Sequence, residues 1–228
     1  MNILCIGKSG QVAQALAERG AAAGIPVTCL GRPELDLLDP AQVAAALDAQ
    51  TPDLVVNAAA YTNVDGAEGD REAAFALNAD APGKLAALCA ERRVPLVHIS
   101  TDYVFDGRGE TAWRETDPTG PINVYGASKL AGEAAVRAAT VQHAIVRTSW
   151  VYSPYGNNFA KTMLRLGRER PELSVVADQI GAPTGALEIA DAILAMAPVL
   201  TSSDDAFGTY HFAASGYGSW ADFAEEVF

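Results

Sequence analysis

The segment Asn2-Ile-Leu-Cys-Ile-Gly7-Lys-Ser-Gly10-Gln-Val-Ala13 decides the fold of this chain. A short apolar run ends at Gly7, and a helical pattern follows to about Ala23. A strand, a glycine turn and a helix in this order are the context that a dinucleotide-binding fingerprint requires. In that interpretation Gly7 permits the tight turn, and Gly10 lets the backbone approach a pyrophosphate at the helix N-terminus. The spacing is G-x-x-G-x-x-A rather than G-x-G-x-x-G, so a plain strand–turn–helix is the alternative.

The same alternation continues along the chain. Strand-like apolar runs at 26–30, 53–57, 95–100 and 143–148 alternate with helical patterns at 40–49, 80–92 and 125–139. We expect Asp39 and Asp80 to cap two of these helices at their N-termini. Strands that alternate with helices of this length predict an α/β fold, with a Rossmann-like, doubly wound parallel sheet and right-handed crossovers.

The pattern loosens after residue 152. The elements expected there are a helix bearing Lys161, Arg165 and Arg168, strands at 173–177 and 210–213, and a capping box from Ser219 to Asp222 that opens a last helix. A nearby diphosphate and a solvated helix face explain the three basic residues about equally well. We expect residues 1–149 to form an NAD(P)-binding domain and residues 150–228 a smaller substrate-binding part. The helical pattern stops at Phe228 without a cap, so we expect this part to be incomplete at its C-terminus.

Composition argues against several classes of protein. The chain has 228 residues, half of them hydrophobic, and a formal net charge of −12. The acidic balance leaves no basic stripe to neutralise phosphates, which argues against a nucleic-acid partner. No run approaches the ~20 apolar residues of a membrane span, and no signal-peptide pattern opens the chain. We therefore expect a cytoplasmic protein with a small-molecule substrate and no membrane partner, present as a monomer or weak homodimer.

Cysteine and histidine do not suggest a metal centre. All six lie in apolar or strand-like runs: Cys5, Cys29, Cys89, His98, His143 and His211. The cysteines are interpreted as reduced core thiols, and the histidines as core or edge residues. No spacing resembles a zinc site, so we assign no metal-binding residue.

Small and hydroxyl residues follow two of the expected strands. Ala58, Ala59 and Ala60 come directly after the run at 53–57, Ser100 ends the run at 95–100, and Thr101 follows it. In an open parallel sheet, ligands bind outside the carboxyl ends of the strands. The small residues would let a flat ligand approach the backbone there, and the hydroxyls would reach the same edge.

The segment Tyr125-Gly-Ala-Ser-Lys129 carries the strongest chemical signal. A spacing of four residues places both side chains on one face of a helix, one turn apart. A free tyrosine titrates near ~10, and a neighbouring ammonium is expected to lower that pKa. The pair is thus a candidate general acid/base at neutral pH, with Thr101 supplying a hydroxyl to the same substrate oxygen. The alternative is a chance spacing on an ordinary packing helix.

The end of the second expected strand bears on cofactor choice. An NAD-preferring site usually has an acidic residue there, which holds the ribose 2′-hydroxyl. Here Gly31 and Arg32 occupy that place. An arginine suits a 2′-phosphate, so we expect NADPH to bind at least as well as NADH. The alternative is a surface arginine without a function.

Taken together, these motifs resemble the extended short-chain dehydrogenase/reductase superfamily and, within it, the dTDP-4-dehydrorhamnose reductase family. The matching segments are Gly7-Lys-Ser-Gly10-Gln11-Val12, Glu34-Leu-Asp36-Leu, Asn57-Ala-Ala-Ala-Tyr61-Thr-Asn-Val-Asp65, Ser100-Thr-Asp-Tyr-Val-Phe-Asp-Gly107, Tyr125-Gly-Ala-Ser-Lys129, Arg147-Thr-Ser-Trp150-Val-Tyr152 and Asp178-Gln-Ile-Gly-Ala-Pro-Thr184. They occur in order along the whole chain. The segments 100–107 and 181–184 are the most specific to the family.

The resemblance implies reduction of a dTDP-4-keto-6-deoxyhexose at C4 by NADPH or NADH. It implies that Tyr125 is the proton donor and that Thr101 polarises the substrate carbonyl. It also implies that Lys129 lowers the pKa of Tyr125 and holds the nicotinamide ribose. The implied cofactor-binding residues are Gly7, Gly10, Gln11, Val12, Arg32, Asp36, Leu37, Ala58, Ala59, Ala60, Tyr61, Thr62, Ser100, Tyr125 and Lys129. The implied substrate-binding residues are Thr101, Asp102 and Trp150.

The sequence departs from the family pattern in two respects, and two rival functions stay open. The N-terminal glutamate through which some members bind Mg²⁺ between subunits falls near Ala15, so a metal-bridged dimer is not expected. The family chain is also longer. A sibling dehydratase or epimerase shares the Tyr/Lys pair, but dehydratases carry an acidic base where Tyr103 stands here. A non-catalytic, NADP-binding regulatory subunit is the other rival.

Overall fold

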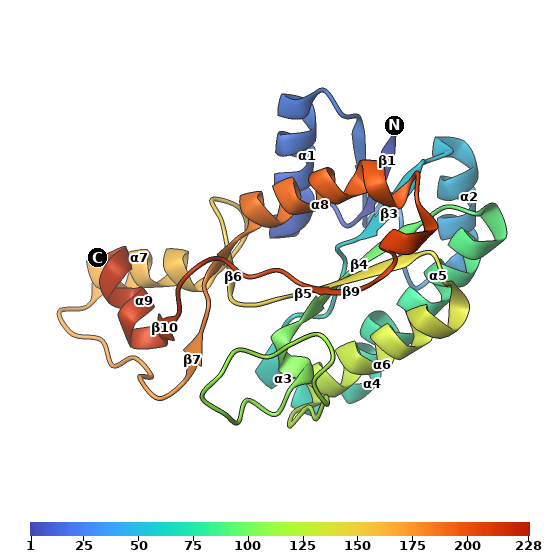
Figure 1. Ribbon diagram of the computed structural model, residues 1–228. Coiled ribbons are helices and arrows are strands. Elements are labelled where there is room, and N and C mark those ends of the chain that lie inside the picture. Colours follow the sequence, from blue (N-terminus) through green and yellow to red (C-terminus); the bar gives the residue numbers. More distant parts are fainter.

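A six-stranded parallel sheet forms the centre of the protein (Figure 1). The computed structural model describes residues 1–228, except for the side chain of Asp204. The strand order is β2-β1-β3-β4-β5-β9, with β1 Ile3–Ile6, β2 Val27–Leu30, β3 Leu54–Asn57, β4 Leu96–Thr101, β5 His143–Thr148 and β9 Gly208–His211. The chain winds outward from β1 in both directions, so the switch point lies between β1 and β3. The predicted doubly wound sheet is confirmed.

Two helical layers cover the sheet, and the alternation of side chains along the strands decides which residues face each layer. Ile3 and Cys5 of β1 pack toward α1 Gln11–Ala23 and α8 Ala186–Leu200. Leu4 and Ile6 pack toward the opposite layer, which contains α2 Pro40–Gln50, α5 Ala81–Arg92 and α6 Val124–Ala139. Each fully buried leucine or isoleucine side chain contributes roughly 1.5–3 kcal/mol, so the strands are fixed on both faces.

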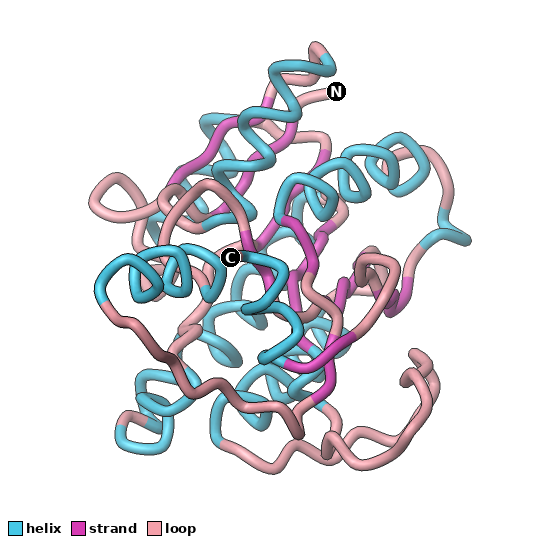
Figure 2. The backbone as a smooth tube through the Cα atoms, turned by 90° about the vertical axis from the view of Figure 1, so that its left-hand side faces the viewer, coloured by secondary structure: helices cyan, strands magenta, loops and turns pink.

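The C-terminal elements form a smaller lobe beside the carboxyl ends of the strands. Its elements are β6 Val151–Tyr152, α7 Phe159–Glu169, β7 Ile180–Gly181, β8 Thr184–Gly185, β10 Gly218–Ser219 and α9 Trp220–Val227. In Figure 2, which views the left-hand side of Figure 1, the lobe and the C-terminus lie in front of the sheet. Phe159, Trp220 and Phe223 hold α7 and α9 together. Between these elements the chain returns to the main sheet through α8 and β9.

Two of the three predicted helix caps are present. Asp39 caps α2, where its carboxylate accepts hydrogen bonds from the N–H groups of Ala41 and Gln42. The capping box of Ser219 and Asp222 is also present. The prediction for Asp80 is wrong: it makes no side-chain cap and lies inside continuous helical backbone. The helical region begins earlier, through α3 Val64–Gly69, α4 Arg71–Phe75 and the π-helical turn η1 Ala76–Asp80, which the sequence analysis missed.

The strand expected at 173–177 is not formed. This segment is irregular and joins no sheet. Val176 is 48% exposed, and its carbonyl accepts a hydrogen bond from the N–H of Ala221 at the start of α9. A strand needs a partner ladder as well as β-branched residues, and this segment pairs with no strand.

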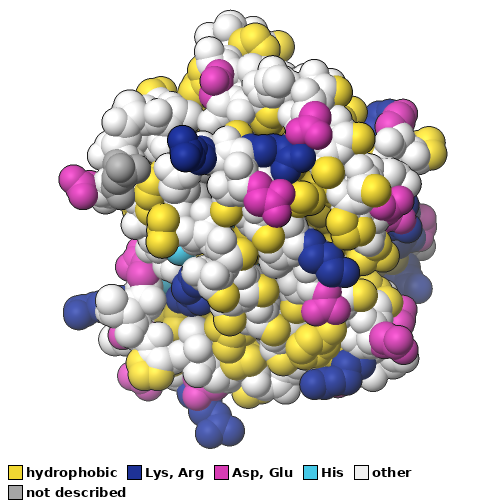
Figure 3. All heavy atoms as spheres, turned by 90° about the vertical axis from the view of Figure 1, so that its right-hand side faces the viewer, with side chains coloured by type: hydrophobic (Ala, Val, Ile, Leu, Met, Phe, Trp, Pro, Cys, Tyr) yellow, Lys and Arg dark blue, Asp and Glu magenta, His cyan; other side chains and the backbone are white. Residues whose placement is uncertain are grey.

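Charges of both signs are mixed on the face shown in Figure 3. Basic and acidic side chains alternate there among hydrophobic ones, so that face carries no continuous basic stripe. Among the described residues, no helix combines the length and apolar character needed to cross a bilayer.

Candidate active site

One cavity of about 960 Å³ lies at the carboxyl ends of the parallel strands, next to the C-terminal lobe. The residues that the sequence analysis assigned to cofactor or substrate all line it: Gly7, Gly10, Gln11, Val12, Arg32, Asp36, Leu37, Ala58, Ala59, Ala60, Tyr61, Thr62, Ser100, Thr101, Asp102, Tyr125, Lys129 and Trp150. The structure thus brings together residues from six separate segments of the chain. Their individual roles remain predictions.

The glycine turn forms the end of this cavity that fits a dinucleotide. Gly7 has a φ of +130°, and a Cβ there would lie 3.3 Å from the backbone of Ala58. Gly10 precedes α1 without any side-chain cap, which leaves N–H groups of the first turn available to a ligand. The N-terminus of this 13-residue helix favours negative charge. The backbone therefore fits the pyrophosphate of a nicotinamide dinucleotide.

Two buried polar residues, Asn57 and His98, hold the small residues that follow β3. The side-chain oxygen of Asn57 accepts a hydrogen bond from the Ala59 N–H at 3.2 Å. The Asn57 amide nitrogen donates to Nδ1 of His98 at 3.1 Å. Burial lowers the pKa of His98 well below its usual value, so the ring is neutral, as a core histidine should be. The hydrogen bond from Ala59 thus fixes the backbone of residues 58–60, which lines the cavity.

The rim beside β2 carries the residues expected near the adenosine. Arg32 is exposed there, whereas Lys8 forms an ion pair with Glu34 at 2.5 Å. The Asp36 carboxylate accepts a hydrogen bond from the Leu38 N–H at 3.0 Å and so shapes the turn. Among the described residues, the Arg32 side chain makes no hydrogen bond or ion pair, which leaves its guanidinium available to a 2′-phosphate.

The candidate catalytic groups meet at the far end of β4. Thr101 ends that strand, and its hydroxyl donates to the Asp102 carboxylate at 3.0 Å. Burial raises the pKa of Asp102 to about 6, although the hydrogen bond from Thr101 opposes the shift. Tyr125 lies on the first turn of α6, 9% exposed, with its ring edge-on to Tyr103 at a centroid distance of 5.5 Å. A carboxylate, an alcohol and a phenol thus border the same part of the cavity.

The electrostatic expectation for Tyr125 is wrong in direction. Burial raises the pKa of Tyr125, and the contribution of the Thr101 hydroxyl, which lowers the pKa, does not offset it. Lys129 is not among the groups that shift this pKa. The physical reason is that removal of the phenolate from water outweighs the other contributions. The phenol is therefore fully protonated at neutral pH, which suits a proton donor better than a base.

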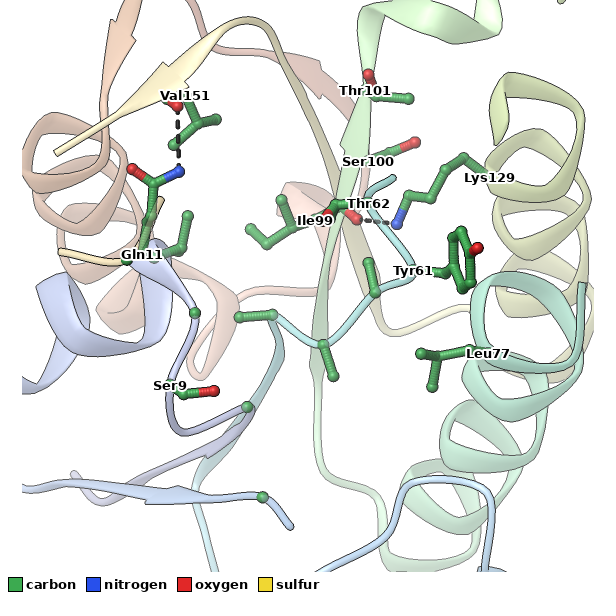
Figure 4. Close-up of a pocket in the computed structure, with 18 of the residues that line it drawn as sticks. Ser9, Gln11, Tyr61, Thr62, Leu77, Ile99, Ser100, Thr101, Lys129 and Val151 are labelled. Carbon is green, nitrogen blue, oxygen red and sulfur yellow. Dashed lines mark hydrogen bonds between the residues drawn. The ribbon is translucent and has the colours of Figure 1, made fainter. Parts of the chain in front are cut away.

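Lys129 lies on the same face of α6, as the spacing predicted. Its ammonium donates a hydrogen bond to the Ile99 carbonyl at 2.6 Å (Figure 4). Burial lowers the pKa of Lys129 to about 8, and the negative charge of Glu133 limits the shift. The ammonium form therefore predominates at neutral pH, with a charge that falls in the weakly alkaline range.

Glu133 lies one turn beyond Tyr125 and Lys129 on the same face of α6. The sequence had not indicated this residue. Its carboxylate is fully buried and accepts two hydrogen bonds from Arg147, at 2.8 and 2.7 Å. Ser100 and Arg137 also donate to it, at 2.6 and 2.8 Å. Burial acts to raise the pKa of Glu133, but these donors outweigh it and hold the pKa below its usual value. The spacing of four residues from Lys129 was a sequence signal that predicts this shared face.

Asn78 is a second missed residue. Its side-chain oxygen accepts from the Tyr61 N–H at 2.8 Å, and its amide nitrogen donates to the Tyr61 carbonyl at 3.0 Å. The same nitrogen donates to the Ser128 hydroxyl at 2.9 Å, and Ser128 donates to the Tyr125 carbonyl. Asn78 lies on the π-helical turn, a feature that occurs often at functional sites. It connects the 58–62 segment to α6.

Trp150 forms the wall toward the C-terminal lobe. Its φ is +45°, an uncommon conformation for a bulky residue. Its ring is stacked on Trp220, with centroids 3.5 Å apart and planes at 10°. A Cβ on Gly181 would lie 2.3 Å from the Trp150 ring, so only glycine fits behind it. Trp220 also lines the cavity, and sequence patterning had not indicated it.

Comparisons with known proteins agree with this geometry. The model of the RmlD substrate binding domain matches residues 1–228. A dTDP-4-dehydrorhamnose reductase from Sinorhizobium fredii (strain NBRC 101917 / NGR234) is 48% identical over 230 residues, which cover 100% of this chain and 77% of that relative. Among the described residues, no cluster of His, Cys, Asp or Glu is placed to hold a metal ion.

Two solved structures are similar along the whole chain. A dTDP-4-dehydrorhamnose reductase from Clostridium acetobutylicum matches with a TM-score of 0.93 and 37% identity, over 100% of this chain and 79% of that one. The enzyme of the same name from Bacillus anthracis, solved in complex with NADP, matches with a TM-score of 0.92 and 39% identity, over 100% and 80%. The chain therefore belongs to the RmlD family of dTDP-4-dehydrorhamnose reductases, within the extended short-chain dehydrogenases/reductases.

Proposed function

We propose that the protein reduces the C4 ketone of dTDP-4-dehydro-L-rhamnose to dTDP-L-rhamnose, with NADPH or NADH as the reductant. The observation that carries this proposal is one continuous cavity with the glycine turn at one end and Thr101, Tyr125 and Lys129 at the other. The names of the relatives, and the NADP bound to one of them, support it. The product would serve nucleotide-sugar synthesis for cell-surface polysaccharide.

Tyr125, Thr101 and Lys129 have different roles in the proposed reduction. When bound, the nicotinamide supplies the hydride for the reduction. Tyr125 is protonated at neutral pH because it is buried, so it can give its proton to the oxygen that gains negative charge. With substrate bound, the Thr101 hydroxyl would turn its one proton from the Asp102 carboxylate to the same oxygen and stabilise that charge. The Lys129 ammonium adds positive charge to this end of the cavity and can hold the nicotinamide ribose.

The substrate side is proposed for residues of the second part of the chain. We infer that residues 1–149 hold the cofactor and that residues 150–228 contribute the substrate wall. Trp150 and Trp220 would border the sugar with their stacked aromatic rings, and Asp102 would offer a hydrogen-bond acceptor. The position of the intersubunit Mg²⁺ glutamate falls near Ala15, which is fully buried, so the proposed state is a monomer or weak homodimer without that metal.

An NADPH-oxidation assay separates the proposal from its rivals. The protein should oxidise NADPH in the presence of dTDP-4-dehydro-L-rhamnose and leave dTDP-glucose unchanged. A 4,6-dehydratase would convert dTDP-glucose without net oxidation of NADPH; Tyr103, where such enzymes have an acidic base, argues against this. A regulatory subunit would bind NADPH and oxidise none of it. Either of these last two results contradicts the proposal.

The pH dependence of the reduction should have an alkaline limb. Lys129 must be charged to act on the ribose, and its pKa is lowered to about 8 by burial. We expect kcat/KM to fall as pH rises through about 8, because the ammonium is lost there. Lys129→Arg keeps a charge at this position up to a far higher pH, so its residual activity should lack this limb. A wild-type rate that stays level up to pH 10 would remove Lys129 from this role.

Cofactor preference should depend on Arg32. Arg32→Ala should weaken NADPH binding by roughly 5–30-fold, equivalent to about 1–2 kcal/mol for a charge-assisted phosphate contact at an exposed position. NADH binding should change little, because NADH lacks the 2′-phosphate. Dissociation constants from NAD(P)H fluorescence measure both effects. An equal loss for the two cofactors would show that Arg32 does not contact the phosphate.

A further inference from the structure

We propose that Gln11 is a positioning residue that couples cofactor binding to substrate binding. This inference rests on the proposed function, because it takes the cofactor to lie at the N-terminus of α1 and the sugar against Trp150. The family resemblance implies only a cofactor-binding role for Gln11. The structure shows that the Gln11 side chain contacts the C-terminal lobe (Figure 4).

The Gln11 side chain makes three hydrogen bonds to the lobe, all across more than 130 residues of sequence. Its amide nitrogen donates to the Val151 carbonyl at 3.1 Å. Its amide oxygen accepts from the Ser153 hydroxyl at 2.8 Å and from the Asn158 amide at 2.9 Å. Both ends of the amide are therefore used, and the side chain has little freedom to turn. By contrast, Gln14 bonds back to the Ser9 carbonyl near the start of its own helix.

The segment 153–158 is organised around this contact. The Asn158 amide also donates to the carbonyls of Ser153 and Tyr155, which closes the loop on itself. The Asn158 side-chain oxygen accepts from the Lys161 N–H and so caps α7. The loop tip lies on Gln11, where a Cβ on Gly156 would be 3.5 Å from Gln11 Cγ. The Tyr155 hydroxyl donates a further hydrogen bond to α1, to the Glu18 carboxylate.

One residue thus holds parts of two subsites. The Gln11 N–H is in the first turn of α1, where it has no intrahelical partner and faces an anion site. Its side chain holds Val151, which directly follows the Trp150 wall. A cofactor bound at the glycine turn adds contacts to the Gln11 backbone, and the Gln11 side chain passes this stabilisation to the segment 151–158 through its three hydrogen bonds. The substrate then binds to a wall that the cofactor has further stabilised, which gives positive coupling between the two ligands without any large movement.

Equilibrium binding of NADPH and dTDP tests this, since the two do not react with one another. In the wild type, NADPH should tighten dTDP binding by a factor within about 5–150, the usual range of coupling between sites. Gln11→Met keeps the length and the backbone N–H but removes all three hydrogen bonds. Its NADPH affinity without dTDP should stay near the wild-type value, and its coupling factor should fall toward 1. Ser153→Ala removes only one of the three hydrogen bonds to the Gln11 side chain, together with the two between the Ser153 hydroxyl and the backbone of Tyr155, so it should reduce the coupling factor less.

Arg19→Ala is the matched control. It lies on the same helix and removes an exposed contact from α1 to Asp191 on α8, away from the cavity, so it should keep the wild-type coupling. Melting temperatures identify any variant that fails to fold, in which case Ser153→Ala decides. Wild-type coupling in both Gln11→Met and Ser153→Ala, or no coupling in the wild type, overturns the inference. A wild type that binds no NADPH overturns the proposed function as well.

Discussion

Replacing Tyr125 by phenylalanine is expected to lower kcat by about 10²–10⁴-fold, or roughly 3–5 kcal/mol of barrier. The change removes the hydroxyl that donates the proton and leaves the ring, which is buried and packed edge-on against Tyr103. The fold and the affinity for NADPH should therefore survive. The loss should appear in kcat rather than in cofactor binding, because the proton is needed only as charge develops. Steady-state kinetics and NADPH titration of the same preparation measure both quantities.

Tyr210→Phe is the control for loss of a phenol hydroxyl as such. Tyr210 lies on β9 outside the cavity and donates to the Ala206 carbonyl at 2.6 Å. It should keep the wild-type turnover. A Tyr125→Phe enzyme that retained more than about a tenth of that turnover would exclude Tyr125 as the proton donor, since general acids contribute at least ~10²-fold.

Replacing Glu133 by glutamine is expected to destabilise the protein by about 3–5 kcal/mol. The carboxylate is fully buried and neutralises Arg147, which is itself 5% exposed. Without that charge, Arg147 stays buried and unpaired, and its desolvation is no longer compensated. Denaturant unfolding at neutral pH measures the effect. Arg147 also lies over the Phe105 ring at 5.1 Å, so the 100–113 segment should loosen with it.

Glu169→Gln is the matched control. Glu169 pairs with Arg165 at a spacing of four residues, as Glu133 does with Arg137. Both side chains of the Glu169 pair are more than half exposed, and such pairs contribute only about 0.3–0.5 kcal/mol. The pH dependence should distinguish the two pairs as well. The pKa of Glu133 is lowered by folding, so its stabilisation is present above the unfolded value of 4.5 and is lost as pH falls through the native pKa. Equal losses for the two variants would contradict the account of the network.

Much of the fold could be predicted, because local signals and burial agree over residues 1–148 apart from the helical turns at 64–80. β1, the glycine turn and α1 follow from one apolar run and two glycines, and β5 was predicted residue for residue as 143–148. The edge of the sheet at which ligands bind follows from parallel topology. That rule places residues as distant in sequence as Gly10 and Lys129 in one cavity.

The remainder depends on contacts that a single sequence does not display. The phenol of Tyr125 titrates according to its burial, which the spacing to Lys129 does not reveal. The roles of Asn78 and Glu133 become visible only when α6 packs on η1 and β4. The segment 173–177 has β-branched residues but no partner strand. Gln11 shows the same limit, since its motif indicates a backbone role and gives no sign of the contacts of its side chain.

Transfer of deuterium from labelled cofactor tests the central claim most directly. The protein would be incubated with dTDP-4-dehydro-L-rhamnose and NADPH that is fully deuterated at C4 of the nicotinamide ring. The account predicts one deuterium in the product, at C4 of the sugar, as seen by NMR and by mass. NADPH binding without deuterium in any sugar product, or deuterium at another sugar carbon, would contradict the claim that this cavity reduces the C4 ketone.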